Sequence, residues 1–522
     1  MAFERVAVVG GGLAGLSAAL RLKECGLHVE LFERSRLLGG RATSFDLGGT
    51  EVDNGQHVFL ACCTEFIDFA SRAGMAEKLR LQPRFDARII SRDGKSGRLS
   101  AGALPAPFHL TPTFARYPHL NVREKLNIAR ALSAVVRETA PIGVTVTFEE
   151  WLHRNHQGGA ERRAFWDPFF IPALNAPFDR VSAEDALFVL RTAFLRDAAA
   201  ARFGFSTVPL AHLAQAAAAR LDAVHLSTPI FEISLQDDTV IPVGQGSFDA
   251  VVLAVPPRQA ARLLADPKRY GVESLDDYEP YPIIDVHLWH DAGALGFDFA
   301  AALDSPLQWI FEKAPGYVCC SLSAAQEYLL LPTSELESFA WRETQTFLPQ
   351  LGSARLTRSA VTRNPEATWL ARLGAPRTAQ RTNDPRIAIA GSWTDTGWPD
   401  TMESAVRSGT LAAEVLLHVQ DEVSSPARTL VGPPPCGPPA APLFRENEVL
   451  NIASCDARKS WSPRLENSPR PEAQPALKRA IEWLLREQNT EGWWSGELET
   501  NVTMTAEHVL LCRFLGIPTD GF

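Results

Sequence analysis

The sequence is poor in several features that would mark particular classes of protein. Its eight cysteines in 522 residues are too few for a disulfide scaffold, and no pair reads C-x-x-C. No apolar run approaches the roughly 20 residues that a membrane-spanning helix needs. Positive charge is also in deficit, since the net charge is −10 and nucleic-acid binding requires a basic face. We therefore expect no metal site, no nucleic-acid partner and a reducing, cytoplasmic location.

The length exceeds what one hydrophobic core supports, so several domains are expected. Residues 1–420 have the composition and periodicity of a globular unit. Residues 421–475 are dense in proline and have little periodicity, which predicts a disordered linker. Helical periodicity returns in residues 476–522, so the chain ends in a short helical tail.

A dinucleotide-binding motif opens the chain. Gly10, Gly12 and Gly15 form G-x-G-x-x-G between a β-branched strand and a helix, and Glu33 closes the next strand. The first glycine allows a tight turn, the second lets the backbone approach a pyrophosphate, and the third allows close packing of helix on strand. A carboxylate at the position of Glu33 can accept hydrogen bonds from ribose hydroxyls. The motif predicts a Rossmann-type α/β domain, with further cofactor contacts from Leu13, Ala14 and Arg34.

Several distant blocks, taken together, resemble the FAD-dependent amine oxidase and phytoene desaturase family. The resemblance spans residues 5 to about 418 and implies that the cofactor is FAD. The blocks that carry it are ERSRLLGGRATSF (33–45), VDNGQHVF (52–59), LSTPIFEI (226–233), VVLAVPP (251–257) and AGSWTDTGWPDTMESAVRSG (390–409).

The resemblance also implies roles for individual residues. It places Gly40 and Arg41 at the FAD pyrophosphate and Ile230 against the adenine. The segment of Asn54, Gly55, Gln56 and His57 would pass the ribityl chain and the flavin ring. The flavin edge would meet Gly391, Ser392, Thr401, Met402 and Glu403.

Asp400 and Glu403 have the spacing of a helix-capping pair, so we expect a helix to begin at Thr401. In the family, the N-terminus of this helix faces the flavin N1/C2 edge. Ser392 stands where the family commonly has an acidic residue, and Asp395 is a candidate replacement. Ser404 stands in place of a usual glycine.

The family architecture implies an FAD-binding domain with an inserted α+β substrate domain. We expect FAD-binding parts at about 1–100, 205–275 and 380–420, and substrate parts at about 101–204 and 276–379.

Four further blocks resemble the bacterial hydroxysqualene dehydroxylases, and their aromatic content suits a tunnel for a long-chain isoprenoid. These blocks are residues 53–60, 165–195, 282–291 and 307–313. The resemblance implies FAD-dependent reductive dehydroxylation of hydroxysqualene to squalene in hopanoid biosynthesis. His57 and Asp167 are the candidate proton donors, although for His57 a role that only orients the backbone at the cofactor is favoured over catalysis. The electron donor is not identified.

The tail has its own resemblance. Leu484, Gln488, Gly492 and Trp494 follow the L-x3-Q-x3-G-x-W repeat of squalene-hopene cyclases, and the residues after them resemble the start of such an enzyme. So short a fragment lacks the cyclase's acidic motif and is expected to be inactive. It suggests a link to squalene synthase-like enzymes and squalene-hopene cyclase. A water-insoluble substrate also suggests peripheral attachment to the inner face of the cytoplasmic membrane.

Three other interpretations remain open from the sequence. The same flavin chemistry could run oxidatively, as in carotenoid-type desaturases acting on squalene or phytoene. The fold also occurs in non-catalytic prenyl-lipid carriers. The chain could finally belong to a bifunctional fusion with a cyclase.

Overall fold

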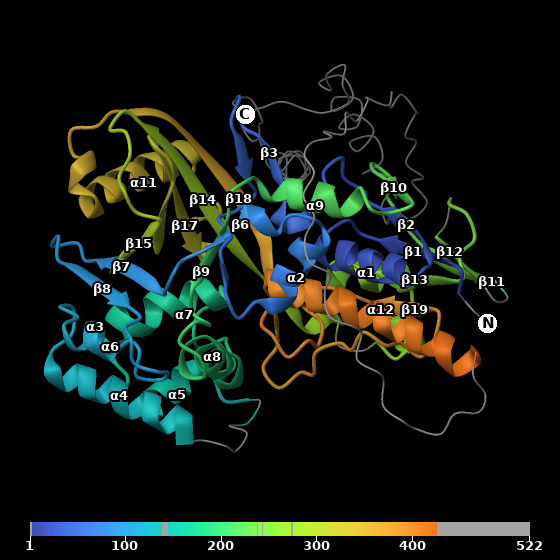
Figure 1. The fold of residues 1–522 in the computed structure, drawn as a ribbon, viewed down its shortest axis with the longest axis horizontal. Helices are drawn as coiled ribbons and strands as arrows, with labels where there is room; N and C mark the ends of the chain where they lie inside the picture. Colours follow the sequence, from blue (N-terminus) through green and yellow to red (C-terminus); the bar gives the residue numbers. More distant parts are fainter. Residues whose placement is uncertain are drawn as a thin grey trace, which may run out of the picture. The chain divides into compact units, whose positions relative to one another are not determined.

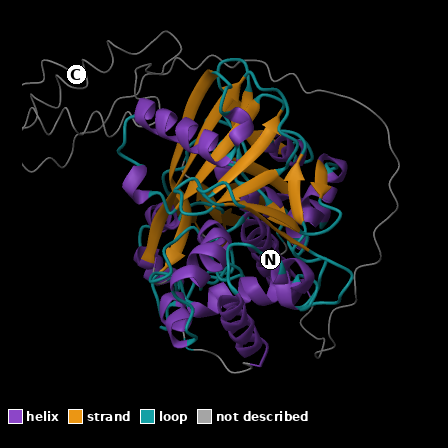
Figure 2. Ribbon diagram, turned by 90° about the vertical axis from the view of Figure 1, so that its left-hand side faces the viewer, coloured by secondary structure: helices purple, strands orange, loops and turns teal. Residues whose placement is uncertain are grey.

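The computed structural model describes residues 3–137, 143, 145–236, 239–242, 244–272 and 275–424. The predicted tail, and all but the first residues of the predicted linker, lie outside the described residues. Two sheets organise the described part, one of five strands and one of seven (Figures 1 and 2). Mixed helix and sheet content of this kind confirms the predicted fold class.

The five-stranded sheet is parallel and carries the nucleotide motif. It joins distant parts of the chain, because Val8 pairs with both Leu31 and Val252. Both of its faces are buried, which explains why its strands are short apolar runs rather than alternating ones. In spatial order the strands are β10 (Ala223–His225), β2 (His28–Phe32), β1 (Arg5–Val9), β13 (Ala250–Leu253) and β19 (Ile387–Ile389).

Helices cover this sheet on both sides. Val6 and Val8 pack towards one group of helices, whereas Ala7 and Val9 pack on the opposite face, which α10 (Pro257–Leu264) covers. The first group consists of α1 (Leu13–Glu24), α2 (Thr64–Arg72), α9 (Leu210–Ala218) and α12 (Met402–Ser424). Figure 1 shows α1 and α12 running side by side.

The seven-stranded sheet forms the substrate part. Its strand β14, second from one edge, pairs antiparallel with two neighbours, so Asp285 lies opposite Ser321 on one side and Thr362 on the other. Ile284, Val286 and Leu288 face α11 (Thr333–Phe347), and the alternate residues of β14 face the other way. In order the strands are β18 (Leu356–Ala371), β14 (Tyr278–His290), β17 (Tyr317–Ser323), β16 (Trp309–Ala314), β15 (Phe299–Ala302), β7 (Asp86–Ile90) and β8 (Ser96–Ser100).

The boundary predicted at residue 100 differs from the structure. Strands β7 and β8, residues 86–100, already belong to the seven-stranded sheet, because β7 pairs with β15 from much later in the chain. Nothing in a short strand's own pattern indicates which sheet it will join.

Helices dominate residues 111–195, as the sequence predicts. Two of them continue as π-helices, Arg162–Trp166 before α7 and Arg191–Leu195 after α8. The helices are α3 (Thr111–Ala115), α4 (Val122–Arg137), α5 (Phe148–Arg154), α6 (Gly159–Glu161), α7 (Asp167–Leu174) and α8 (Ala183–Leu190). Short strands complete the fold: β3 (Ser44–Asp46), β4 (Glu51–Asp53), β5 (Phe59–Leu60), β6 (Leu79–Leu81), β9 (Phe203–Ser206), β11 (Ile233–Gln236) and β12 (Thr239–Pro242).

The close approach of α1 and α12 is testable. A Cβ built on Gly409 lies 2.1 Å from the Ala14 carbonyl oxygen, so Gly409→Ala must push the two helices apart. We expect this overpacking to lower the free energy of unfolding by about 1–3 kcal/mol in urea denaturation. Leu411→Ala on the exposed side of the same helix is the control and is expected to have a smaller effect. Equal stability of Gly409→Ala and wild type would contradict this packing.

Candidate active site

A cavity of about 1150 Å³ lies where the carboxyl edge of the five-stranded sheet meets the seven-stranded sheet. Of the predicted cofactor contacts, all except Gly15 and Gly55 line it. Residues from the start, the middle and the end of the described chain therefore converge on one space, as the distant sequence blocks predict.

The glycine motif at one end of the cavity has the predicted geometry. Gly10 has a φ of +110°, which a side chain would strain, and it turns the chain from β1 towards α1. A Cβ on Gly15 would lie 1.9 Å from the Gly10 carbonyl oxygen, so this glycine serves close packing. A Cβ on Gly12 meets nothing nearer than 3.9 Å and would occupy the cavity margin instead.

Glu33 is held by the backbone around it. Its carboxylate accepts hydrogen bonds from the backbone N–H groups of Gly11, at 2.6 Å, and Ser35, at 2.7 Å. These contacts fix the turn after β1 to the turn after β2. The predicted contact between Glu33 and a ribose stays a prediction, and Ile230 and Arg34 line the same end of the cavity.

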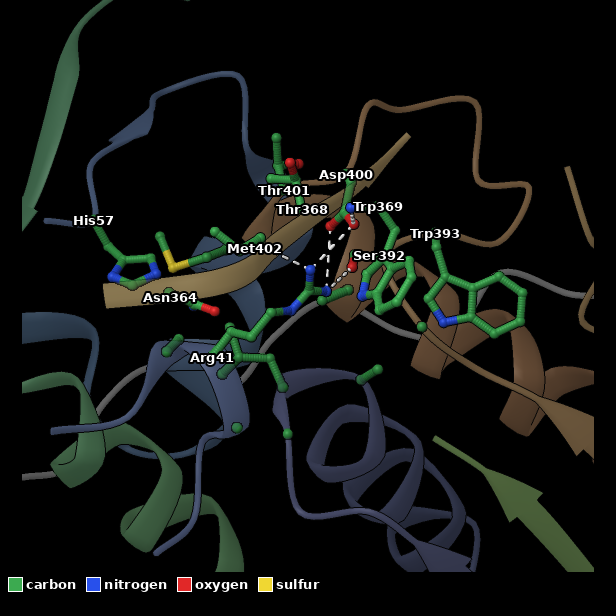
Figure 3. Close-up of a pocket in the computed structure, with 18 of the residues that line it drawn as sticks. Arg41, His57, Asn364, Thr368, Trp369, Ser392, Trp393, Asp400, Thr401 and Met402 are labelled. Carbon is green, nitrogen blue, oxygen red and sulfur yellow. Dashed lines mark hydrogen bonds and ion pairs between the residues drawn. The ribbon is translucent and has the colours of Figure 1, made fainter. Parts of the chain in front are cut away.

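Arg41 joins the middle of the cavity to the last motif of the chain. Its guanidinium donates to the Ala367 carbonyl oxygen at 2.8 Å, to the Asp400 carboxylate at 3.2 Å and to the Ser392 hydroxyl (Figure 3). The predicted contact of Arg41 with a pyrophosphate stays a prediction. The hydroxyl of Ser392, which replaces the family's usual acid, is committed to Arg41.

The predicted capping pair is wrong. Helix α12 begins at Met402, and the Thr401 hydroxyl rather than Asp400 accepts from the Ser404 N–H, at 3.3 Å. The Asp400 carboxylate instead accepts from the backbone N–H of Trp369, at 2.6 Å, and from the Arg41 guanidinium. Asp400 therefore binds Arg41 and the Trp369 backbone, which lie elsewhere in the chain, and does not cap the helix that its spacing predicted.

Glu403 is also engaged away from its own helix. Its carboxylate accepts from the backbone N–H groups of Glu65 and Phe66, at the start of α2, and from Arg407. Glu403 thus anchors α2 on α12. Asp395, the candidate replacement for the acidic residue, is exposed and lies outside the cavity lining, so it does not take that place.

His57 lines the cavity from the segment between β4 and β5 (Figure 3). Its Nδ1 is 2.9 Å from the Gly55 carbonyl oxygen, which fits an Nδ1–H that donates to that oxygen. Burial lowers the pKa of His57 below its ordinary value, with a smaller contribution from Lys313. A neutral imidazole is a poor proton donor, so the geometry favours the orienting role of His57.

The far end of the cavity is aromatic. Residues that line it from 169–203 and 283–323, two ranges described without gaps, include no charged side chain. Asn175 holds this wall in place: its side chain donates to the Tyr281 carbonyl oxygen and to Thr368, and accepts from the Ala324 N–H. The aromatic members of the wall are Phe169, Phe170, Phe188, Phe194, Phe203, Trp309 and Phe311.

The prediction that Asp167 acts on the substrate is not supported by its position. Its carboxylate lies 3.2 Å from Arg162 and outside the cavity lining, although Phe169 and Phe170 on the same helix do line it. One helix cannot present all of its residues to one side. Burial raises the pKa of Asp167, and the neighbouring Arg162 opposes that shift.

Sequence reasoning missed several polar residues beside the cavity. Trp369 lines it, and its buried indole N–H has no hydrogen-bond partner among the described residues. Ser321 lines it from β17, with the buried Asp285 directly opposite on β14. The only signal for these residues was an acidic residue inside an otherwise apolar strand, PIIDVHLWH.

The fold and the cavity define a flavoprotein. The chain belongs to the family of flavin-containing amine oxidoreductases, whose model matches residues 13–417. It is an FAD-dependent oxidoreductase, so the non-catalytic carrier interpretation is set aside. A second family model, the squalene-hopene cyclase N-terminal domain, matches residues 477–521, where the sequence predicted such a resemblance.

The chain is also similar to individual enzymes with named activities. The chain is 29% identical to hydroxysqualene dehydroxylase from Rhodopseudomonas palustris, over 79% of this chain and 98% of the relative. It is 27% identical to hydroxysqualene dehydroxylase from Zymomonas mobilis, over 78% and 98%. Zeta-carotene desaturase from Arabidopsis thaliana is 25% identical, over 80% and 86%.

Solved structures share the fold. Wild-type putrescine oxidase bound to putrescine superposes with a TM-score of 0.61 at 19% identity, over 80% of this chain and 99% of the oxidase. Cyclohexylamine oxidase from Brevibacterium oxydans gives a TM-score of 0.61 at 16% identity, over 80% and 100%.

The residues of the cavity fit FAD. The N-terminus of α1 has no side-chain cap, so its first N–H groups and its positive dipole end are free for the pyrophosphate. Gly12 leaves room that a Cβ would fill, and the unpartnered Trp369 indole N–H is a free donor within the cavity wall.

Gly12 and Gly15, two of the three glycines of the motif, should respond differently to a methyl group. We expect Gly12→Ala to keep the apoprotein fold but to weaken FAD binding, because the methyl group intrudes on the cofactor. A misfit of about 1–3 kcal/mol corresponds to about a 5- to 150-fold rise in Kd. Gly15→Ala should instead lower the melting temperature of the apoprotein.

Calorimetric titration of FAD and thermal melting of the apoprotein check both statements. Gly158→Ala, at an exposed glycine with ordinary φ and no atom within 4 Å of the added Cβ, is the control. Wild-type FAD affinity in Gly12→Ala would contradict this placement of the cofactor.

Proposed function

We propose that the protein reductively removes the hydroxyl group of hydroxysqualene to give squalene in hopanoid biosynthesis. The observation that carries the proposal is the continuity of the cavity, from the glycine motif to an aromatic wall without charge. Such a wall suits a long hydrocarbon, because each buried apolar group contributes to binding, and the lining residues of this wall supply no carboxylate to pair with an amine.

Two independent similarities support the choice of substrate. The named dehydroxylases are matched over nearly their whole length. The tail, joined to the same chain, matches the N-terminal domain of squalene-hopene cyclase. We infer that the protein works beside enzymes that make hydroxysqualene and consume squalene, with an electron donor that reduces its FAD.

Bound FAD in its reduced form would supply a hydride to the carbon that carries the hydroxyl. The tasks of the chain are to place that carbon, to keep water away and to protonate the departing oxygen. The aromatic wall, fixed by Asn175, serves the first two tasks. Because the alcohol is allylic, protonated loss of water leaves a delocalised cation that the hydride can quench.

An oxidative desaturase is the second candidate function. The similarity to zeta-carotene desaturase and to 15-cis-phytoene desaturase favours it, since these relatives are matched over 80% of this chain. The same cavity would then hold a hydrocarbon that loses hydrogens to oxidised FAD.

Direction of reaction separates the two candidates. Under anaerobic conditions, the prereduced holoenzyme is expected to convert hydroxysqualene to squalene, detected by mass spectrometry, with return of the oxidised flavin absorbance. The oxidised holoenzyme given squalene or phytoene serves as the matched arm. Desaturated products there, with no squalene from the alcohol, would establish the oxidative function instead.

Helix α4 offers a surface for a lipid bilayer, and we propose that the protein docks through it on the inner face of the cytoplasmic membrane. The outward apolar side chains Val122, Leu126 and Val136 are 74%, 52% and 56% exposed. At intervals of four and ten residues they form one stripe, opposite the buried Ile128 and Val135.

Charge supports an anionic lipid surface. Arg123, Arg130 and Arg137 are exposed and recur every seven residues, so they run beside the apolar stripe. This pattern is typical of helices that lie in a membrane interface. No helix among the described residues is long and apolar enough to cross a membrane.

Vesicle flotation tests this surface. We expect the protein to float with phosphatidylglycerol-containing vesicles at low salt, and the triple change of Val122, Leu126 and Val136 to Ser to remain in the soluble fraction. The triple change of the three arginines to Gln should bind less and lose its salt dependence. Leu330→Ser, at an apolar residue that is also exposed, is the control. Wild-type protein that never floats would refute membrane docking.

A further inference from the structure

A buried carboxyl group lies behind the wall of the cavity. Asp285 is 1% exposed and sits in the middle of β14, between Ile283 and His287 on the same face of the strand. Ile283 lines the cavity, and so does Ser321, the residue directly opposite Asp285 on β17. Asp285 therefore belongs to the face of the sheet that forms the cavity wall.

Ser321 connects this carboxyl group to the cavity. The two residues are direct cross-strand partners on one face of the sheet, and the Ser321 hydroxyl and the backbone N–H of Gln56 favour the charged form of Asp285, which lowers its pKa. The Cys319 thiol also donates to an Asp285 oxygen, at 3.9 Å. A Cβ on Gly55 would lie 3.5 Å from an Asp285 oxygen, so the segment of Gly55, Gln56 and His57 packs closely against Asp285.

Asp285 makes no direct contact with a cationic side chain among the described residues. Burial raises the pKa of Asp285 to about 6, and the hydrogen bonds and the more distant Lys313 oppose the shift. Among the described residues, no ion pair within 4 Å involves Asp285. The titratable groups that face it or share its field are His287 on β14, Tyr317 and Cys319 on β17, Lys313 on β16, Asp53 on β4 and His57 after β4.

These neighbours are poor proton carriers in comparison. Burial lowers the pKa of His287 to about 4, and it raises the pKa values of Tyr317 and Cys319 above their ordinary values. His57 is also held neutral. Asp285 thus has a pKa of about 6, closer to neutral pH than the pKa of His287, and lies directly opposite a hydroxyl group that lines the cavity.

We propose that Asp285 and Ser321 form a two-residue relay that protonates the departing hydroxyl of the substrate; this inference rests on the proposed dehydroxylation. Ser321 is the catalytic residue that touches the substrate oxygen, and Asp285 is the proton source that acts through it.

The relay balances the reaction. The C–O bond breaks with its electron pair on oxygen, the Ser321 proton completes a water molecule, and Ser321 takes a proton from Asp285. Reduced FAD provides the hydride of the new C–H bond and is oxidised. Asp285 remains as a carboxylate until solvent reprotonates it after the product leaves.

Three variants test the relay in single-turnover reactions of the prereduced holoenzyme with hydroxysqualene. Asp285→Asn keeps the shape of the side chain but replaces one carboxyl oxygen with an NH2 group and removes the acidic proton, and should slow turnover about 100-fold or more. Ser321→Ala should do the same, whereas Asp285→Glu should recover part of the rate. Asp167→Asn, at a half-buried carboxyl outside the cavity lining, is the control and should react like wild type.

The pH profile distinguishes a proton source from a structural residue. The acid form is the active one, so the wild-type rate should fall as pH rises through about 6. That limb should be absent from Asp285→Asn. Because the folded-state pKa exceeds that of an exposed carboxyl, the stability contributed by protonated Asp285 is lost as pH rises from 3.8 to about 6. Asp285→Asn should therefore raise the melting temperature at pH 8 more than at pH 5.

A readout without turnover completes the test. Infrared difference spectra should show a protonated carboxyl band that titrates near pH 6 in wild type and is missing in Asp285→Asn. Wild-type rate and pH profile in Asp285→Asn, or no such band, would overturn the relay while squalene formation by wild type keeps the proposed function. Absence of squalene from the wild-type reaction would overturn the proposed function and the relay with it.

Discussion

The ion pair between Arg41 and Asp400 holds the centre of this protein together. Arg41 follows β2, and Asp400 lies just before α12. The Asp400 carboxylate accepts from Arg41 and from the backbone N–H of Trp369. Three segments that are far apart in sequence thereby become one wall of one cavity. Loss of either partner would leave a partly buried charge without its counter-charge. The three segments would then no longer be held in place against one another.

A division of labour follows from this arrangement. The five-stranded sheet supplies helix N-termini and backbone N–H groups, which suit a phosphate-bearing cofactor. The seven-stranded sheet and the helices beside it supply aromatic surface, which suits a hydrocarbon. Asp285, Ser321 and His57 form a polar cluster beside the aromatic wall. The proposed reaction needs hydride, a proton and exclusion of water at one carbon, and it would take place beside this cluster.

The nucleotide half could be predicted from the sequence because its determinants are local. Gly10 and Gly15 have the turn and packing roles that their spacing indicates, and Gly12 borders open space. Roles that depend on distant partners were missed or misassigned. Asp400 and Glu403 have capping spacing, yet each binds groups from other segments.

The same limit explains the errors in the catalytic set. Asp167 lies two residues before a cavity-lining phenylalanine, but on a helix that interval turns the side chain elsewhere. Asp285 was not identified because its partner Ser321 belongs to another strand, and only the pairing of β14 with β17 brings them together. Strand register is a property of the folded sheet and cannot be read from either strand alone.

The central claim is that FAD and a long hydrocarbon share one cavity, with hydride passing between them. The most direct test is to carry out a single turnover of prereduced holoenzyme with hydroxysqualene in D2O, where the transferable hydrogen of reduced flavin exchanges with solvent. The claim predicts squalene with one deuterium at the carbon that bore the hydroxyl, as located by mass spectrometry and NMR. Squalene without deuterium at that carbon, or no squalene at all, would contradict it.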